Sequence, residues 1–333
     1  MTSADRPDVS VLIAAWNAEA TIAAALDCAL GQDGPRVEVI AVDDASTDGT
    51  VDVLHAAAAR DPRVTVLVQP ANRGPAAARN RALAHARAPF VTILDADDTM
   101  APDRLARLTA IADAGSWDIV ADDLWKVEPG QPRSAARRLW SADPIGTVEL
   151  DFAGFVTGNL SRLSAERGEL GFLKPLMRRD MLRLHRLTYR EDMRLGEDYA
   201  LYAAALASGA RACLTDPCGY YALVRPGSLS GRHDAAALRG LAEADHWLAT
   251  LPNLAPTDRT ALRAHDRETQ ERWRWMRLIE AVKRRDAVEA ARCFGGAPAV
   301  SLALLGRLAE QARLRTARRF VDWRARGATG GPS

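Results

Sequence analysis

Three aspartates, Asp95, Asp97 and Asp98, fall among four consecutive positions directly after an apolar run that ends at Leu94. Like charges a few ångströms apart repel by about 1 kcal/mol even in water, so something should offset this crowding. If the apolar run is a strand, one carboxylate at its end can hold a divalent cation while another takes a hydroxyl group. Hard cations such as Mg²⁺ bind through one or two carboxylates together with substrate phosphates.

The alternative for this cluster is a helix cap, in which Asp98 or Thr99 caps a helix that opens at Pro102. A cap requires one carboxylate, whereas the cluster holds three. The excess favours ligand binding, and both roles can coexist.

A second acidic pair, Asp43 and Asp44, lies at the end of another apolar run, in "VDDASTDGT". A carboxylate after the second strand of a nucleotide-binding fold can accept a hydrogen bond from a base or a ribose hydroxyl. The next three residues, Ser46, Thr47 and Asp48, are typical of a turn and a helix cap. We therefore predict nucleotide recognition for the pair and a local structural role for the three residues that follow.

An aromatic ring and an amide, Trp16 and Asn17, follow the first apolar run. The ring could stack on a planar base, although tryptophan is also an ordinary packing residue. In "ANRGPAAARNRAL", Arg73, Arg79 and Arg81 lie near a predicted helix N-terminus, which can bind an anion. Arginines on a helix are usually solvated, so this pattern alone is weak.

The pair Glu197 and Asp198 opens a predicted helix. Acids are favoured at such a position by the helix dipole, so the pattern leaves a catalytic and a structural role equally open. His233 is a lone histidine in a Gly/Ser loop, where a solvated imidazole is favoured over a metal ligand.

These residues are positioned by a chain that alternates strands and helices. Buried strands are predicted at 9–15, 37–43, 64–69, 90–95 and 117–121, and helices at 20–30, 49–60, 75–87 and 102–114. This order predicts a parallel sheet with helices on both sides, and such sheets bind ligands at the carboxyl ends of their strands. The residues that follow the strands are Trp16, Asn17, Glu19, Asp43, Asp44, Asn72, Arg73, Gly74, Asp95, Asp97 and Asp98. Nearly all are polar, which a shared pocket explains and core packing does not.

The regular alternation of predicted strands and helices ends beyond residue 121. The stretch 122–165 is predicted to be irregular and to receive a second substrate. A helix is predicted within 195–211, from about Glu197 to a stop at Gly209, and further helices at 235–250, 257–284 and 299–325.

The overall composition and charge limit the classes of function that the chain can have. With 333 residues, 48% hydrophobic content and a net charge of +1, the chain can bury a large core, and its charge gives no reason to expect a nucleic-acid partner. The four cysteines lack metal-site or disulfide spacing, and no signal peptide or spanning segment is apparent, so a reducing, cytoplasmic setting is expected. Neither G-x-G-x-x-G nor G-x-x-x-x-G-K-[ST] is present, which argues against dinucleotide dehydrogenases and P-loop enzymes.

Five stretches, "VSVLIAAWNAEATI", "VIAVDDASTDGT", "NRGPAAARNRAL", "ILDADDTMAPDRL" and "LGEDYALYAAAL", resemble in order the motifs of family 2 glycosyltransferases, which are inverting enzymes with the GT-A fold. The resemblance covers about residues 8–232. The stretches "IVADDLW", "GELGFLKPLMRRDML" and "YYALVRPGSLSGR" further resemble the glucosyltransferases of succinoglycan-type exopolysaccharide assembly.

The resemblance implies an α/β GT-A domain at 1–232, with a mostly parallel central sheet, a nucleotide-binding half at 1–100 and an acceptor half at 101–232. A helical extension would follow at 233–333. It implies that Trp16 stacks on uracil, which Asp44 contacts, and that Asp198, beside Glu197, is the catalytic base. The implied donor-binding residues are Ala14, Trp16, Asn17, Glu19, Asp43, Asp44, Asn72, Gly74, Arg79 and Asp95, and the implied ligands of Mg²⁺ or Mn²⁺ are Asp97 and Asp95.

The implied reaction moves a hexose, glucose in the narrower resemblance, from a UDP-sugar to a saccharide or lipid-linked saccharide in polysaccharide biosynthesis. Two alternatives remain. A sugar-phosphate nucleotidyltransferase should carry a Gly-rich phosphate loop after the first strand, but "AAWNAEA" has no glycine. A non-catalytic nucleotide-sugar-binding protein would leave Asp198 without a role.

The C-terminal stretch 305–326 contains seven arginines interleaved with leucine, phenylalanine and tryptophan. Such a helix can lie on an anionic membrane leaflet, which would suit a lipid-linked acceptor and a peripheral location at the inner face of the plasma membrane. It can equally pack its apolar stripe on the main domain, and the sequence leaves both open.

Overall fold

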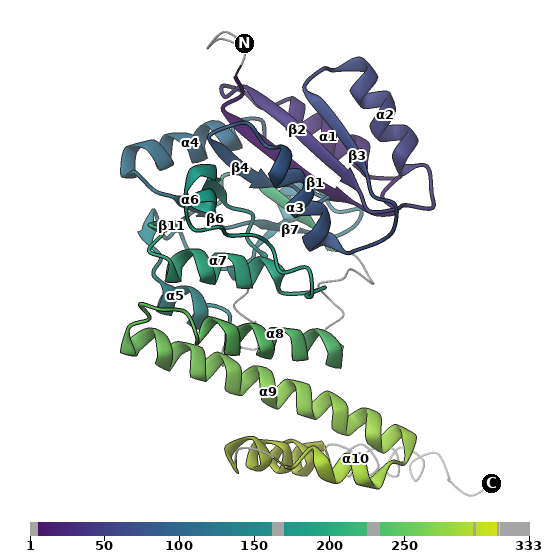
Figure 1. The fold of residues 1–333 in the computed structure, drawn as a ribbon, viewed down its shortest axis with the longest axis vertical. Coiled ribbons are helices and arrows are strands. Elements are labelled where there is room, and N and C mark those ends of the chain that lie inside the picture. Colours follow the sequence, from purple (N-terminus) through teal and green to yellow (C-terminus); the bar gives the residue numbers. More distant parts are fainter. Residues whose placement is uncertain (1–5, 162–169, 225–233, 296–297, 312, 314–333) are drawn as a thin grey trace, which may run out of the picture.

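The computed structural model describes residues 6–161, 170–224, 234–295, 298–311 and 313. Its first part confirms the predicted alternation of strands and helices (Figure 1). The elements are β1 (Val9–Ala15), α1 (Ile22–Leu30), β2 (Val37–Asp43), α2 (Thr50–Arg60), β3 (Val64–Val68), α3 (Pro75–His85) and β4 (Phe90–Ile93). The strands β1, β2 and β4 are almost entirely buried, as strands covered on both faces must be. The expectation of a buried strand at 64–69 is wrong in this respect, because β3 lies at the edge of the sheet and only Val64 in it is buried.

The parallel register brings three strand ends to one edge of the sheet. β1 pairs with β2, with Ala15 opposite Asp43, and with β4, with Leu12 opposite Ile93. The chain adds β2 and β3 on one side of β1 and then crosses back, so that β4 lies on the other side of β1 and the spatial order is β3-β2-β1-β4. Because crossovers between parallel strands are right-handed, this reversal puts α3 on the opposite face from α1 and α2.

The sheet continues into the second half of the chain, in the order β3-β2-β1-β4-β10-β6-β11-β9. The strand predicted at 117–121 is β6 (Ile119–Asp122), and β11 (Ala212–Thr215) runs parallel to it. β10 (Leu176–Arg178) lies antiparallel between β4 and β6, and β9 (Val148–Glu149) is an antiparallel edge. The mostly parallel sheet is thus confirmed. Strands as short as β9 and β10 have too few residues to show a periodic pattern.

A second, four-stranded sheet also lies outside the sequence prediction. It has the order β5-β12-β7-β8 and contains β5 (Thr99–Met100), β12 (Tyr220–Leu223), β7 (Trp125–Val127) and β8 (Arg137–Arg138). The expectation that 122–165 is irregular is therefore wrong in part, since this stretch also holds η2 (Arg133–Ala135) and α5 (Phe152–Thr157). Pairing of β12 with β5 brings Tyr220 next to the aspartate cluster after β4.

Four further elements surround the second half of the large sheet. They are α4 (Arg104–Gly115), η3 (Leu170–Phe172), α6 (Arg179–Leu184) and α7 (Glu197–Ala207). Gly196 before α7 and Gly209 after it have φ of +82° and +92°, a left-handed region that favours glycine. The predicted start at Glu197 and stop at Gly209 are thus confirmed.

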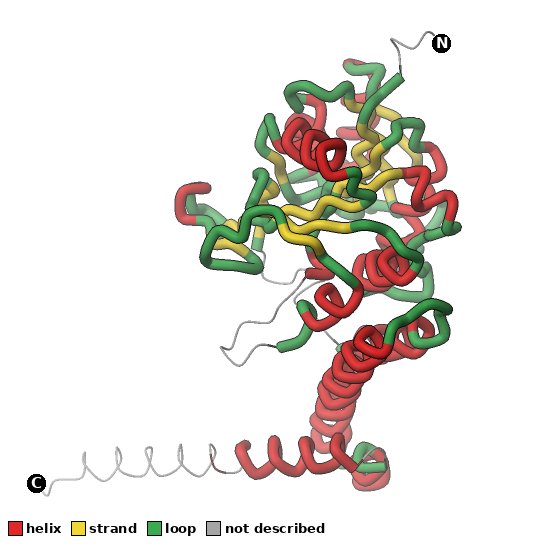
Figure 2. Tube along the Cα trace, turned by 90° about the vertical axis from the view of Figure 1, so that its left-hand side faces the viewer, coloured by secondary structure: helices red, strands yellow, loops and turns green. Residues whose placement is uncertain are grey.

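The C-terminal part is helical, as expected. It consists of α8 (Ala235–Leu248), α9 (Pro256–Arg284), α10 (Ala287–Arg292) and a helix over 298–311. The helices α7, α8 and α9 lie side by side beneath the sheet (Figure 1), and α9 leads the chain away from it (Figure 2). The rest of the predicted helix 299–325 and the proposed boundary at 232 lie outside the described residues. In the described part of the chain, no helix is both long and apolar enough to span a membrane.

A buried polar network connects α7 to the helical extension. The hydroxyl of Tyr199 donates to Asp245 Oδ1 over 2.8 Å, and His265 Nδ1 lies 2.7 Å from Asp245 Oδ2. The rings of Tyr199 and His265 stack with centroids 4.6 Å apart. Because Tyr199 directly follows Asp198, this network fixes the start of α7 relative to α8 and α9.

Candidate active site

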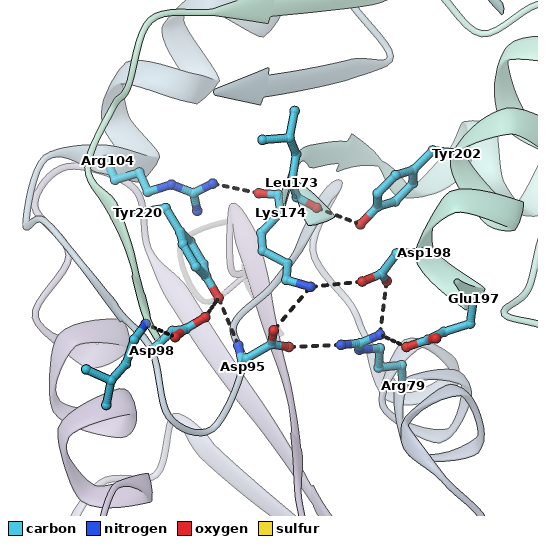
Figure 3. Close-up of polar contacts among 11 residues, drawn as sticks. Arg79, Asp95, Asp98, Arg104, Leu173, Lys174, Glu197, Asp198, Tyr202 and Tyr220 are labelled. Atoms are coloured by element: carbon cyan, nitrogen blue, oxygen red, sulfur yellow. Dashed lines mark hydrogen bonds and ion pairs between the residues drawn. The ribbon is translucent and has the colours of Figure 1, made fainter. Parts of the chain in front are cut away.

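The carboxyl edge of the sheet brings together side chains from four separate segments. Asp95 follows β4, Arg79 comes from α3, Lys174 lies between η3 and β10, and Asp198 belongs to the first turn of α7. Figure 3 shows the four side chains pointing toward one another. The residue after β4 and the acidic start of α7, which the sequence marked separately, therefore meet in one place.

Two cations bind the same two aspartates. Arg79 Nη2 donates to Asp95 Oδ1 at 2.9 Å, and Arg79 Nη1 donates to Asp198 Oδ1 at 3.0 Å. Lys174 Nζ lies 3.1 Å from Asp95 Oδ2 and 2.8 Å from Asp198 Oδ2 (Figure 3). Arg79 Nη1 also donates to Glu197 Oε1 at 2.6 Å. We call these five side chains the ion array.

The ion array is buried except at Asp95. The side chains of Arg79 and Lys174 are 6% exposed, whereas that of Asp95 is 32% exposed. With three carboxylates and two cations, the array has a formal charge of −1. Buried charges cost several kcal/mol each unless they are paired and hydrogen-bonded, so its members depend on one another.

The pKa shifts follow from burial and mutual attraction. Burial would raise the pKa of Asp95, but the charges of Lys174 and Arg79 outweigh it and lower that pKa to about 2. Burial lowers the pKa of Lys174, but the charges of Asp198 and Asp95 outweigh it and raise that pKa above its usual range. Burial raises the pKa of Glu197, although Arg79 opposes the shift.

The third aspartate of the cluster has a different role. Asp98 accepts hydrogen bonds of 2.8 Å from the backbone N–H of Leu223 and from the hydroxyl of Tyr220. Burial and the nearby charges of Asp95 and Asp97 raise the pKa of Asp98 to about 8. The cap alternative is wrong for Asp98 and Thr99: α4 begins at Arg104, and its N-cap residue is Asp103.

The crowding of aspartates is therefore offset largely by the protein itself. Asp95 faces two cations, and Asp98 binds a tyrosine and a backbone amide. Asp97 is half-buried in the same turn.

The acidic pair after β2 shapes the adjacent loops. Asp44 Oδ1 accepts from Gln69 Nε2 at 2.6 Å and from the N–H of Arg73 at 2.8 Å, and its Oδ2 accepts from the N–H of Gly74 at 2.8 Å. Asp43 Oδ2 accepts from the N–H of Ser46, while its Oδ1 is buried with no partner in the described part of the chain. Asp44 thus fixes the loop that leads into α3, and Asp43 holds the turn that follows β2.

The residues after β1 hold the loop after β2. Asn17 Oδ1 accepts from the N–H of Thr47 at 2.8 Å, and Glu19 Oε2 accepts from the N–H of Gly49 at 3.0 Å. The predicted turn is thus present. Gly49 is the N-cap residue of α2, and Asp48 Oδ1 accepts a hydrogen bond of 3.1 Å from the N–H of Thr50, the first residue of the helix, so the predicted capping by this segment is present as well. Trp16, beside this junction, is 53% exposed.

The remaining candidates vary in exposure. Ala14 is half-buried at the end of β1, Asn72 is exposed, and Gly74 is buried with φ of +89°. Of the three arginines expected near an anion site, only Arg79 joins the ion array: Arg73 pairs with Glu191, and Arg81 donates to the carbonyl of Val68. The expectation that arginines on a helix are solvated is therefore wrong for Arg79, whose side chain is buried and paired.

Lys174 and Tyr220 were not selected from the sequence, although the stretches that contain them were. A charged residue within the apolar run "FLKPLM" is a signal for Lys174, since lysine is rarely buried without a partner. Tyr220 gives no comparable signal. The partners of both residues lie far away in sequence.

The remaining questions concern a metal site built from protein side chains alone and the state of the cysteines. In the described part of the chain, no three His, Cys, Asp or Glu side chains are grouped so that they could hold a metal ion. All four cysteines are free thiols in the structure. His233 lies outside the described residues.

The chain is similar in sequence to known proteins. The model of a family described as "Glycosyl transferase family 2" matches residues 10–161. The succinoglycan biosynthesis protein ExoU of Rhizobium meliloti (strain 1021) is 41% identical over 309 residues, which cover 92% of this chain and 88% of that protein.

Solved structures share the fold at lower identity. The mannosyltransferase PcManGT from Pyrobaculum calidifontis, in complex with GDP-Man and Mn²⁺, aligns with a TM-score of 0.58 and 22% identity over 96% of this chain and 83% of that one. TarS 1–349 of S. aureus, in complex with UDP-GlcNAc, aligns with a TM-score of 0.58 and 20% identity over 86% of this chain and 90% of that one.

Proposed function

The chain belongs to glycosyl transferase family 2, and on that basis we propose that it transfers a hexose from a UDP-sugar to a hydroxyl group of a saccharide or lipid-linked saccharide. We propose glucose as the hexose, inversion at the anomeric carbon, and polysaccharide biosynthesis as the setting. The printed name of ExoU, succinoglycan biosynthesis protein, supports the setting, and the UDP-GlcNAc held by TarS supports a nucleotide-sugar donor.

Family membership makes the chain an enzyme that transfers glycosyl groups with a GT-A fold. This favours transfer over the sugar-phosphate nucleotidyltransferase and the non-catalytic binder that the sequence left open. The ion array is the observation that carries the more specific proposal. It joins Asp95, beside the proposed donor, to Asp198, the proposed base.

We assign the roles as follows. Asp198 takes the proton of the attacking acceptor hydroxyl, a contribution typically worth 10²- to 10⁴-fold in rate. Glu197 and Arg79 orient Asp198, and Asp95, the most exposed of these side chains, contacts hydroxyls of the ribose or the donor sugar. Attack from the face opposite the diphosphate converts an α-linked donor into a β-glycoside without a covalent enzyme intermediate.

Nucleotide recognition is proposed for the loops after β1, β2 and β3. The exposed ring of Trp16 supports stacking on the base. Ala14, Asn17 and Glu19 would shape the same wall, together with Asn72 and Gly74. Since Asp43 and Asp44 are buried beneath these loops, we propose that they act on the nucleotide mainly by fixing the loop that receives it.

Mg²⁺ or Mn²⁺ is the cation that we propose for the diphosphate. A site completed by phosphate oxygens needs only one or two carboxylates, and Asp97, which is half-buried in the turn after β4, is the ligand that the resemblance to the family implies. When bound, the cation stabilises the negative charge of the leaving diphosphate. A ligand role for Asp95 stays a prediction.

The helix over 298–311, which we call the helical arm, supports a peripheral membrane contact. Leu302 and Leu305 are 68% and 53% exposed, so these two residues do not pack on the main domain. Arg307 follows them, and the sequence adds six further arginines by residue 326. We propose that the arm lies on an anionic leaflet at the inner face of the plasma membrane, near a lipid-linked acceptor. Equal cosedimentation of full-length protein and a truncation at residue 304 with anionic liposomes would contradict this contact.

A donor screen tests the proposed function. The protein is incubated with UDP-glucose, UDP-galactose, UDP-GlcNAc and GDP-mannose, with and without an acceptor extract, and nucleotide release is measured. We expect acceptor-stimulated release of UDP, fastest with UDP-glucose. Formation of pyrophosphate from UTP and a sugar 1-phosphate, without sugar transfer, would instead favour the nucleotidyltransferase.

A further inference from the structure

Lys174 has a backbone that is held in place on both sides. The carbonyl of Lys174 accepts a hydrogen bond of 2.6 Å from Arg104 Nη2, and the carbonyl of Leu173 accepts one of 3.2 Å from the hydroxyl of Tyr202. Arg104 is itself fully buried and paired with Asp122. Figure 3 shows the Lys174 side chain extending from this segment to the gap between Asp95 and Asp198. Its direction is therefore set by the fold.

Lys174 and Arg79 divide the oxygens of the two aspartates between them. In both Asp95 and Asp198, Oδ1 faces Arg79 and Oδ2 faces Lys174. Arg79 is also held by Glu197 and lies 5.6 Å from the centre of the Tyr189 ring. Removing Lys174 would thus free one oxygen of each aspartate, while Arg79 would keep its other contacts.

The relative position of these two aspartates matters for group transfer. In the proposed function, Asp95 contacts the donor and Asp198 contacts the acceptor hydroxyl. Their separation therefore helps to set the distance between the attacking oxygen and the anomeric carbon. A misplacement of about 1 Å can cost about 10²-fold in rate.

We propose that Lys174 is a positioning residue that locks the donor-side carboxylate of Asp95 to the base Asp198, so that the two substrates meet at reacting distance. The inference rests on the proposed function and extends it to a residue outside the donor and base motifs. Lys174 acts through the two aspartates and needs no contact with either substrate.

The first test compares Lys174→Met with wild type and with Lys283→Met, a matched control on the exposed end of α9. We expect kcat of Lys174→Met to fall by about 10²-fold, with the Kd for UDP changed by less than about threefold, because Lys174 needs no contact with UDP and Asp95 keeps its ion pair with Arg79. Lys283→Met should match wild type in both quantities. A folded Lys174→Met enzyme with wild-type kcat would overturn the inference.

A second comparison, between variants that keep the charge of the array balanced, tests the inference even if Lys174→Met alone does not fold. Lys174→Met leaves three carboxylates with one cation, so the pair Glu197→Gln and Lys174→Met/Glu197→Gln is measured as well. The double variant restores the array's formal charge of −1. We expect it to melt within a few degrees of Glu197→Gln and to have a kcat about 10²-fold lower. Equal kcat values for these two variants would contradict a positioning role.

Rescue by a small amine separates positioning from a general structural role. In Lys174→Ala, added ethylammonium can occupy the vacated space and should raise kcat at least about tenfold, with no effect on wild type or on Asp198→Asn. An absence of rescue, together with equal losses of kcat and UDP affinity, would show a structural role only. A wild-type enzyme that turns over no nucleotide sugar would refute the proposed function and this inference with it.

Discussion

The hydroxyl of Tyr220 donates a 2.8 Å hydrogen bond to Asp98 Oδ2 and accepts one of 3.2 Å from the backbone N–H of Asp95. A single side chain from β12 thus holds both ends of the acidic turn after β4. The turn's three carboxylates consequently have different environments, one facing cations, one facing a tyrosine and one half-buried beside them. This division of roles underlies the predictions below.

The environment of Asp98 predicts a pH-dependent stability. The ordinary pKa of this carboxyl is 3.8, and burial, with the charges of Asp95 and Asp97, raises it to about 8 in the folded protein. Between these values the folded state binds more protons than the unfolded chain, so stability falls as the pH rises. We expect the free energy of unfolding of wild type to fall relative to Asp98→Asn by about 1 kcal/mol per pH unit between pH 6 and 8. Urea titrations at three pH values check this, and parallel pH profiles would contradict it.

Asp97 is the proposed ligand of the diphosphate-bound cation. Asp97→Ala should weaken UDP binding in the presence of Mn²⁺ at least about tenfold and leave metal-free binding unchanged, because a cation of this kind depends on one or two protein carboxylates. Isothermal titration with UDP, with Mn²⁺ or with EDTA, measures both quantities. Metal-dependent UDP binding that survives in Asp97→Ala would exclude this residue as the ligand.

Tyr199 links α7 to α8 and α9. Tyr199→Phe keeps the ring stacked on His265 but removes the hydrogen bond to the buried carboxylate of Asp245. We expect a loss of about 1–3 kcal/mol in the free energy of unfolding, because a buried acceptor is left with one donor fewer. Chemical denaturation of Tyr199→Phe, with Tyr221→Phe as a control for a partly exposed tyrosine, provides the measurement. Equal stability of the two variants would show that the network contributes little.

Two of the four thiols, those of Cys213 and Cys218, should be unreactive in the folded protein. Burial raises the pKa of Cys213 to about 11, and burial, aided by the charge of Asp122, raises that of Cys218 to about 12. Only the thiolate attacks a disulfide reagent, so both should resist labelling at pH 8 and react after unfolding. Mass spectrometry of protein treated with a disulfide reagent, native and in urea, locates the label. Rapid native labelling of Cys213 or Cys218 would contradict their buried environment.

The sequence predicted best what depends on local pattern. The strands β1 to β4, the start of α7 at Glu197 and its end before Gly209 follow from apolar runs, the acidic first turn and glycine. The position of Asp95 at the carboxyl edge of the sheet could be expected because parallel strands end there. These are consequences of spacing along the chain.

What the sequence could not supply depends on contacts between distant segments. Asp98 meets Tyr220 only because β12 pairs with β5, and Lys174 reaches the site only because the three-residue strand β10 lies between β4 and β6. Asp44 is predicted to contact the nucleotide, and its carboxylate also holds the loop before α3, a contact that the sequence did not indicate. An acidic residue that binds a ligand and one that organises a loop look the same in sequence.

Asp198 is the proposed base, the group that takes the proton of the acceptor hydroxyl. Asp198→Asn is therefore compared with wild type for sugar transfer and for UDP binding in the same preparation, with Asp192→Asn, an exposed aspartate, as control. We expect transfer by Asp198→Asn to fall by 10²- to 10⁴-fold while its UDP affinity stays within about threefold of wild type. Wild-type transfer by a folded Asp198→Asn enzyme would contradict the assignment of the base and the mechanism built on it.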